Sequence, residues 1–477
     1  MRLLIAFVST VATLVAAAPT FNKEIAPILY QNCATCHRPG EVAPFSLVTY
    51  QDAAKRAGLI ATVTKKRYMP PWKPEPGYGS FAHVRRLTDE QIALIGEWAA
   101  TGAQEGEAAD QPKVPAFPTG WQAGEPDQVL KVSAPYPLAA DGPDRFRCFV
   151  LPMNLSKESY VSGAEFRPGN PRVVHHALIF LDSSGTARRL AGASGGYPCF
   201  GGPGFSGAGL VMGWAPGYTP MPAEPSLSQA VRPGTDVVIQ IHYHPSGKPE
   251  EDQSSIGLKF SGPPTKGRAL LPVMNRYLDI PAGESHYVVK GSVTLPQDAD
   301  LWGITPHAHY LATDMKVNAR LPDGSVTPLI WIKDWDFNWQ GQYRYEKPIH
   351  LPKGTKVELE YTYDNSAGNP HNPSHPPVRV RYGEQTKDEM ALAFLGLVLP
   401  SPADVQPFQR AVVLQYVEDF VRLTDNVNDL PEEIPPAMAG RLRLALGMFD
   451  RDKDGKLNAE ERATLLRFIQ TMMPQSQ

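Results

Sequence analysis

Between residues 121 and 400 the chain alternates short runs of β-branched and aromatic residues with turns rich in glycine and proline. Turn sequences such as Pro-Gly-Thr-Asp at 233–236 and Leu-Pro-Asp-Gly at 321–324 separate these runs. Runs typical of strands occur at 173–180, 237–244, 287–289 and 357–361. Short strands joined by such turns favour antiparallel pairing. This region is therefore predicted to fold as antiparallel β-sandwiches.

The length and charge of the chain limit its fold and its partners. At 477 residues it is too long for a single hydrophobic core, so several domains are expected. Charged residues are 20% of the total and the net charge is -3. No basic field for nucleic acid is expected from this balance.

The first 18 residues have the pattern of a secretory signal peptide. A basic start at Met1-Arg2 precedes an apolar run over 3–15 and three alanines at 16–18. A membrane anchor is the alternative, but the run is shorter than the ~20 residues that a span needs. An exported protein, periplasmic or secreted, with no membrane span after cleavage is predicted.

Residues 19–106 are predicted to form a small helical domain around one motif, Cys33-Ala34-Thr35-Cys36-His37. This is the pattern for covalent attachment of haem c, with two thioethers and a proximal histidine. A Cys-x-x-Cys redox pair is the alternative, which the adjacent histidine and the export signal disfavour. The segment resembles a class I-type cytochrome c domain. Met69 is the candidate sixth ligand and His83 is its competitor.

Two further features border this domain. A capping box, Thr88 to Gln91, opens a helix at its end. A proline-rich linker is predicted over 107–120. The two remaining cysteines, Cys148 and Cys199, are predicted to form a disulfide in an oxidising compartment.

Six of the twelve histidines fall in three short clusters within the β-rich region. His307 and His309 stand two residues apart, so on a strand both reach the same face. His175 and His176 are adjacent, and both can bind one metal only if the backbone bulges or the strand ends there. In the third cluster His242 and His244 share a face, and spacing alone allows either or both as ligands.

These clusters occur in an order that resembles a known family, the copper type II, ascorbate-dependent monooxygenases. The order is His175-His176, His242-Tyr243, His307-Ala308-His309 and Asp388-Glu389-Met390. The resemblance implies two tandem jelly-roll-like β-sandwich domains, over 121–270 and 271–400.

The resemblance also implies two copper ions with different ligands. One copper takes His175, His176 and His242 and transfers electrons. The other takes His307, His309 and Met390, the catalytic set that binds and activates oxygen. Imidazoles hold copper in both oxidation states, and a thioether favours Cu(I). Met315 is a competing thioether, because it follows His309 by an even number of residues.

Three positions depart from the peptide-amidating members of that family. Thr305 stands where they have an arginine that binds the substrate carboxylate, and Leu392 and Phe394 stand where they have Asn and Tyr. A small apolar or aromatic substrate is therefore expected in place of a peptidylglycine.

The predicted function is an exported copper monooxygenase that hydroxylates a C–H bond with O2. Electrons come through the fused haem domain, with an external donor beyond it. A haem and copper electron-transfer or copper-binding protein without oxygenase activity is the alternative. A binding module with metal-free histidines is a further one.

The chain becomes helical again over 401–477 and contains an EF-hand loop at 450–461. Gly455 supplies the turn of the loop. Oxygen ligands for calcium come from Asp450, Asp452, Asp454, Asn458 and Glu461. A calcium ion is predicted there, with a structural role favoured over a regulatory one.

Overall fold

The computed structural model describes residues 18–472, except 42, 118–119, 206–208, 219, 384, 424–442 and 445. The predicted signal peptide lies outside the described residues except for Ala18. The chain divides into two compact units, which are described separately. One contains residues 1–72 and 84–118, and the other contains 73–83 and 119–477.

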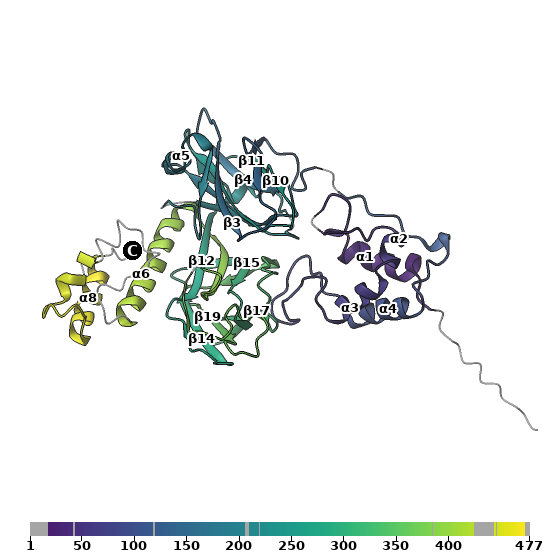
Figure 1. The fold of residues 1–477 in the computed structure, drawn as a ribbon. Helices are drawn as coiled ribbons and strands as arrows, with labels where there is room; N and C mark the ends of the chain where they lie inside the picture. The colour runs from purple at the N-terminus through teal and green to yellow at the C-terminus, as the bar shows by residue number, and fades with distance from the viewer. Residues whose placement is uncertain are drawn as a thin grey trace, which may run out of the picture. The chain divides into compact units, whose positions relative to one another are not determined.

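The first unit is helical, and its described residues include no strand. Its elements, at the purple end of the chain in Figure 1, are η1 (Phe21–Ile25), α1 (Ala26–Asn32), α2 (Tyr50–Ala54), α3 (Ala57–Lys65), α4 (Asp89–Ala100) and η2 (Ala108–Asp110). The capping box is confirmed, since Thr88 and Gln91 exchange both hydrogen bonds at the start of α4. Phe21, Leu29 and Trp98 are fully buried in its core.

The second unit begins with two antiparallel sheets, here called the N-terminal sandwich. The first sheet has the order β1 (Gln128–Lys131), β11 (Ser255–Ser261), β4 (Ser159–Arg167), β8 (Gln229–Val231). The second has the order β6 (Gly196–Pro198), β3 (Arg145–Pro152), β9 (Asp236–Tyr243), β5 (Val174–Asp182), β7 (Gly209–Trp214). A short pair is β10 (Glu250–Asp252) with β2 (Tyr136–Leu138), and the helical turns are α5 (Thr186–Ala191), η3 (Gly192–Ser194) and η4 (Pro225–Leu227).

Strand β9 is buried along its whole length and divides its side chains between two environments. Ile239, Ile241 and Tyr243 belong to the main core, together with residues of both sheets. The opposite face carries Gln240 and His242. Cys148 of β3, which is opposite Gln240, forms the predicted disulfide with Cys199, and this prediction is confirmed.

Two further antiparallel sheets form the C-terminal sandwich. One has the order β12 (Gly267–Asn275), β21 (Ala391–Leu399), β15 (Ala299–His307), β18 (Tyr343–Leu351). The other has the order β14 (Tyr287–Thr294), β19 (Lys356–Tyr363), β16 (Ala312–Arg320), β17 (Val326–Ile332), and β13 (Asp279–Ile280) pairs with β20 (Val380–Arg381). The predicted antiparallel β organisation is thus confirmed for both regions.

A segment that the sequence placed inside the helical domain lies on this sandwich instead. Residues 73–83, here called the strap, pair with β17 of one sheet and β18 of the other, and each is the last strand of its sheet. The Glu75 amide donates to the Trp331 carbonyl at 2.7 Å, and the Ala82 amide donates to the Arg344 carbonyl at 2.8 Å. The strap therefore covers the edges of both sheets, where unpaired backbone groups would otherwise remain.

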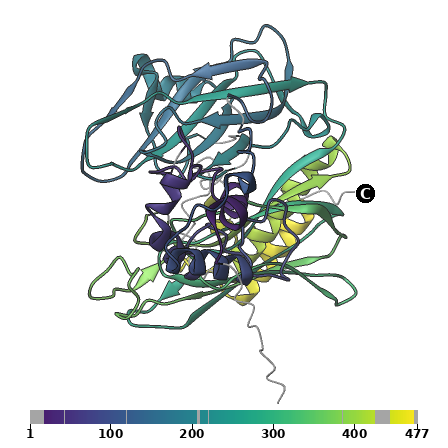
Figure 2. The same cartoon turned by 90° about the vertical axis from the view of Figure 1, so that its right-hand side faces the viewer.

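The C-terminal elements are η5 (Pro402–Asp404), α6 (Val405–Leu423) and α8 (Ala459–Met472). The Gln415 side chain of α6 bonds both the amide and the carbonyl of Thr294, at 2.9 and 2.7 Å, which ties the helix to β14. Figures 1 and 2 show α6 near α8, and Phe420 and Leu465 share a small core between them. Within the described residues no helix is long and apolar enough to cross a membrane.

Candidate metal centres

The first histidine cluster is assembled by two neighbouring strands of the N-terminal sandwich. His176 of β5 is paired with His242 of β9. The register shifts between Val174 and His176, so that His175 is the extra residue of a bulge. This is the irregularity that two adjacent histidines need to reach one point. It brings the side chains of His175, His176 and His242 together.

All three rings present the same nitrogen to the centre of the cluster. The His176 Nδ1 atom lies 3.3 Å from the Nδ1 atom of His175 and 3.3 Å from that of His242. The three residues form a group whose ligand atoms all lie within 4.8 Å of one another. One ion can therefore contact all three Nδ1 atoms.

The environment keeps these histidines neutral. Burial lowers the pKa of His175 to about 4, assisted by His242, and lowers the pKa of His176 well below its usual value. Burial also lowers the pKa of His242, against the opposing effect of Asp144. Neutral imidazole is the form that binds metal, so the cluster is ready for an ion near pH 7.

Asp144 settles the orientation of two histidines whose roles the sequence left open. Its Oδ2 atom lies 2.6 Å from His242 Nε2, and its Oδ1 atom lies 2.8 Å from His244 Nδ1. Burial alone would raise the pKa of Asp144, but these bonds outweigh it and the pKa is lowered. His244 is exposed and is held by the carboxylate, whereas His242 turns its other nitrogen to the cluster.

The second cluster forms where β15 ends. His307 is the last residue of β15 and is paired with Leu392 of β21. Continuing this register past the strand ends sets His309 opposite Met390, and the His309 ring bonds the Asp388 carbonyl next to it. The rings of His307 and His309 are 5.3 Å apart between centroids.

These two rings present the opposite nitrogen from the first cluster. The Nδ1–H of His307 donates to Gln340 Oε1 at 2.7 Å, and that amide is oriented by its own bond to the Phe337 carbonyl. The Nδ1–H of His309 donates to the Asp388 carbonyl at 3.0 Å. Both rings therefore keep Nε2 free for a ligand. Burial lowers the pKa of His307 to about 4 and lowers that of His309.

A buried carboxylate holds the backbone of this second cluster. Glu389 is fully buried and accepts hydrogen bonds from the amides of His309, Leu311 and Met390, at 2.8, 2.6 and 3.0 Å. Burial raises its pKa to about 7, and these amides oppose the rise. The sequence indicated Glu389 only as one letter of a motif, because its partners are backbone groups.

The competing thioether has a different environment. Met315 is fully buried in β16, in the sheet that does not contain β15, and is paired with Ile332 and Tyr361. Met390 instead follows Glu389 directly, and its carbonyl accepts a hydrogen bond from the Tyr363 hydroxyl at 2.6 Å. Only Met390 is tied to the backbone of His309.

In the helical unit the Cys-x-x-Cys-His motif follows α1 as a tight turn. Cys33 and Cys36 are free thiols, and burial raises the pKa of Cys33 to about 12 and that of Cys36 as well. The Nδ1–H of His37 donates to the Phe45 carbonyl at 3.1 Å, which leaves Nε2 free for a metal.

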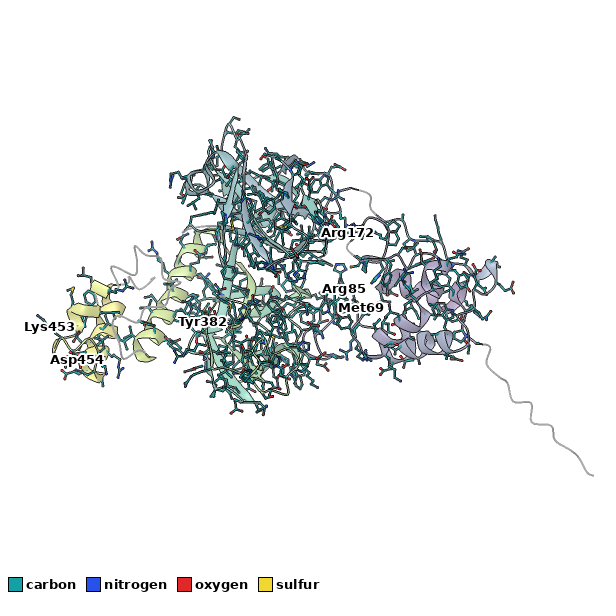
Figure 3. The ribbon with its side chains drawn as sticks, viewed as in Figure 1. Met69, Arg85, Arg172, Tyr382, Lys453 and Asp454 are labelled. Carbon is teal, nitrogen blue, oxygen red and sulfur yellow. A yellow bond between two sulfur atoms is a disulfide. The ribbon has the colours of Figure 1, made fainter. Side chains whose placement is uncertain are left out.

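The two candidate sixth ligands lie in different units. Met69, labelled in Figure 3, belongs to the same unit as His37, and its amide donates to the Val63 carbonyl at 3.2 Å. His83 is exposed and is the last residue of the strap, in the other unit.

The acidic loop before α8 gathers three carboxylates close together. Carboxylate oxygens of Asp450, Asp452 and Asp454 lie within 4.8 Å of one another. Gly455 has a φ of 80° and its amide donates to Asp450 at 3.0 Å. Figure 3 labels Lys453 and Asp454 in this loop. The Glu461 carboxylate accepts from the amides of Arg451 and Asn458, at 2.7 and 3.0 Å, across the loop.

Comparisons with known proteins do not assign the chain to a family. The chain matches no family model and no curated protein. It is similar to the major capsid protein P2 of bacteriophage PM2, at 8% identity, over 51% of this chain and 99% of that chain, with a TM-score of 0.21. It is also similar to VP2 of infectious bursal disease virus (11% identity, 62% and 76% covered, TM-score 0.16) and to PNGF-II (11%, 66% and 70%, 0.20). TM-scores this low carry no inference about function.

Proposed function

We propose that this protein is a copper-dependent monooxygenase that hydroxylates a C–H bond of a small organic molecule. The observation that carries the proposal is the pair of histidine clusters in one unit with different donor sets. One offers three Nδ1 atoms. The other offers the two rings of His307 and His309, with the backbones of His309 and Met390 bonded to the same Glu389 carboxylate. A reaction that needs one metal to carry electrons and another to meet oxygen uses two sites of different chemistry.

The residues present fit copper. Three neutral imidazoles that already converge suit copper in both oxidation states, and they also suit zinc. The second cluster distinguishes the two metals, because Met390 would add a soft thioether, which favours Cu(I) and which zinc sites seldom use. When bound, the two coppers would supply one-electron transfer and the activation of O2.

The chain itself would hold the ligands of the second cluster in place. Glu389 ties the His309 and Met390 backbones to one carboxylate, and Gln340 and the Asp388 carbonyl fix the two rings with Nε2 free. In the reaction the substrate C–H bond becomes C–OH, and the second oxygen atom leaves as water. Two electrons and two protons are consumed.

Aromatic rings beside the second cluster support an apolar or aromatic substrate. The Phe337 ring lies 5.8 Å from the His309 ring and 4.5 Å from the Tyr310 ring. These rings would give an apolar molecule contact area next to the ligands, and they would exclude water from it.

The helical unit would supply the electrons. Cys33 and Cys36 would attach a haem c as thioethers, with His37 and Met69 as its axial ligands. When bound, that haem would supply one-electron transfer. Calcium in the loop of Asp450, Asp452 and Asp454 would stabilise the helical segment formed by α6 and α8.

The second candidate is a haem and copper electron-transfer or copper-binding protein that inserts no oxygen. The convergence of the three Nδ1 atoms favours it as much as it favours an oxygenase. The two functions differ in the second cluster, because only an oxygenase needs a copper that meets O2 beside a substrate.

The test begins with copper and haem quantification on the purified protein, followed by a product screen under 18O2. We expect two coppers and one haem per chain, and a product that carries one 18O atom. A Met390→Ile variant should keep the first copper and the haem but form no product. Two coppers with no labelled product from any apolar or aromatic compound would favour the electron-transfer protein, and zinc in both clusters would exclude both functions.

A further inference from the structure

We propose that Asp144 is a positioning residue for the first copper: it fixes the His242 ring through Nε2 and makes the site favour Cu(II). The inference rests on the proposed occupancy of the cluster by copper. Asp144 does not touch the metal position, because both of its oxygens are engaged by imidazole nitrogens. It would act through His242.

The geometry gives one ring two partners on opposite sides. His242 Nε2 faces Asp144 Oδ2 at 2.6 Å, while His242 Nδ1 faces His176 Nδ1 at 3.3 Å. A carboxylate only accepts, so Nε2 carries the proton and Nδ1 has the lone pair that a metal needs. The Phe146 ring stacks on His242, with centroids 4.1 Å apart and planes 12° apart, and restricts its rotation.

The carboxylate is itself held in position by a second histidine. His244 Nδ1 donates to its Oδ1 atom at 2.8 Å, and the β3–β9 register that pairs Phe146 with His242 continues to Asp144 and His244. His244 lies two residues after His242, on the same face. His244, whose role spacing alone left open, thus holds the carboxylate in place.

The negative charge would act on the metal through the ring. A carboxylate bonded to the far nitrogen of an imidazole makes that ring a stronger donor. A stronger donor stabilises Cu(II) more than Cu(I), because the higher charge gains more from it. The second cluster uses neutral partners in the same role, Gln340 Oε1 and the Asp388 carbonyl. The first copper should therefore have the lower reduction potential of the two.

The test compares Asp144→Asn with His244→Asn in a His309→Ala background, in which only the first cluster binds copper. Cu(II) and Cu(I) affinities are measured by competition with chelators, and the reduction potential by redox titration monitored by electron paramagnetic resonance. Asp144→Asn should lower the Cu(II) affinity by roughly 10- to 100-fold. The Cu(I) affinity should fall less, and the potential should rise by about 59 mV for each tenfold change in their ratio.

The control variant separates charge from packing. His244→Asn keeps the carboxylate on His242 and should shift the potential in the same direction but by less than Asp144→Asn. An unchanged potential in Asp144→Asn, or an equal loss of affinity for both oxidation states, would overturn the proposal. Thermal unfolding of the copper-free variants identifies misfolding, and an Asp144→Glu variant that restores Cu(II) preference would then support the assignment. Failure of the proposed function is distinct, since it would appear as native protein that binds no copper or forms no product.

Discussion

The two histidine clusters differ in how their ligands are held. In the first, all three rings come from adjacent strands of one sheet, and the pairing of these strands brings their ligand nitrogens together. In the second, one ring ends a strand, and His309 and Met390 lie on separate loops joined by the Glu389 carboxylate. A copper site that only accepts and passes on one electron is favoured by rigidly held ligands. A site that must accept oxygen and a substrate needs room at the metal.

The largest effect is expected at the methionine of the second cluster. Met390→Ile should abolish product formation and weaken copper at that cluster alone, because it removes the thioether but leaves the first cluster intact. Met315→Ile is the matched control. It changes the shape of a buried side chain in β16, so we expect a stability cost of about 1 kcal/mol with copper retained. If Met315→Ile loses copper and Met390→Ile keeps it, the second cluster has been assigned wrongly.

The next prediction tests whether the first cluster is the entry point for electrons. The haem is reduced without oxygen, and the protein is then mixed with oxygen and substrate. Haem oxidation should be fast in the intact protein and at least about tenfold slower in His176→Ala. Equal rates in both would show that the haem loses its electron without the first cluster. Electron entry would then have to be assigned to the second cluster, or to both.

Glu389→Gln tests whether the Glu389 carboxylate holds the backbone of the second cluster. An amide offers one accepting oxygen where the carboxylate accepts from three amides, so a buried donor loses its partner at a cost of about 2 kcal/mol. Copper at the second cluster should weaken. Asp252→Asn is the control in the N-terminal sandwich, since Asp252 is also buried and accepts from Tyr243 and Ser254. Asp252→Asn should destabilise the fold and leave the second copper unaffected. Loss of both coppers in either variant would show that Glu389 does not act on the second cluster alone.

The smallest effect on the two clusters is expected from the haem ligand. Met69→Ala should remove the sulfur-to-iron charge-transfer band while the haem stays attached through Cys33 and Cys36. Copper content should not change. His83→Ala should keep the band, because His83 lies in the strap. A band that survives in Met69→Ala would point to another sixth ligand.

Periodicity and spacing predicted the sheets and the faces on which the histidines lie, whereas the grouping of His175 and His176 with His242 was implied only by the family resemblance. Alternation placed His242 on the face of Gln240 and away from Ile239, as the structure has it. The bulge at His175 is one of the two irregularities that the sequence allowed, a bulge or a strand end, because two adjacent histidines cannot share a face of a regular strand. These features depend on residues close together in the chain, and periodicity reports such features well.

Unlike the Cys148–Cys199 disulfide, the contacts that Asp144, Glu389 and the strap make with distant residues could not be predicted from the sequence. Asp144 stands 98 positions before His242, and nothing near it indicates an imidazole partner. The role of His244 stayed open for the same reason. Glu389 acts on backbone amides, which every residue has. The strap is rich in the prolines, glycines and aromatics that are typical of a loop. Its partners lie more than 250 positions later, as the Lys73–Asp334 ion pair illustrates, at a separation of 261.

The strap also bears on how such a fused chain can be taken apart. The peptide crosses between the two units at three places, after Trp72, after His83 and after Pro118. A protease that cuts only the proline-rich linker would therefore release nothing. A chain shortened to begin at that linker would lose the strap along with the helical unit, and β17 and β18 would be left as bare edges that invite self-association. Residues 73–83 therefore belong with the sandwiches and not with the helical unit. When the two sandwiches are expressed without the helical unit, we expect them to stay monomeric only if a peptide with the sequence of residues 73–83 is added.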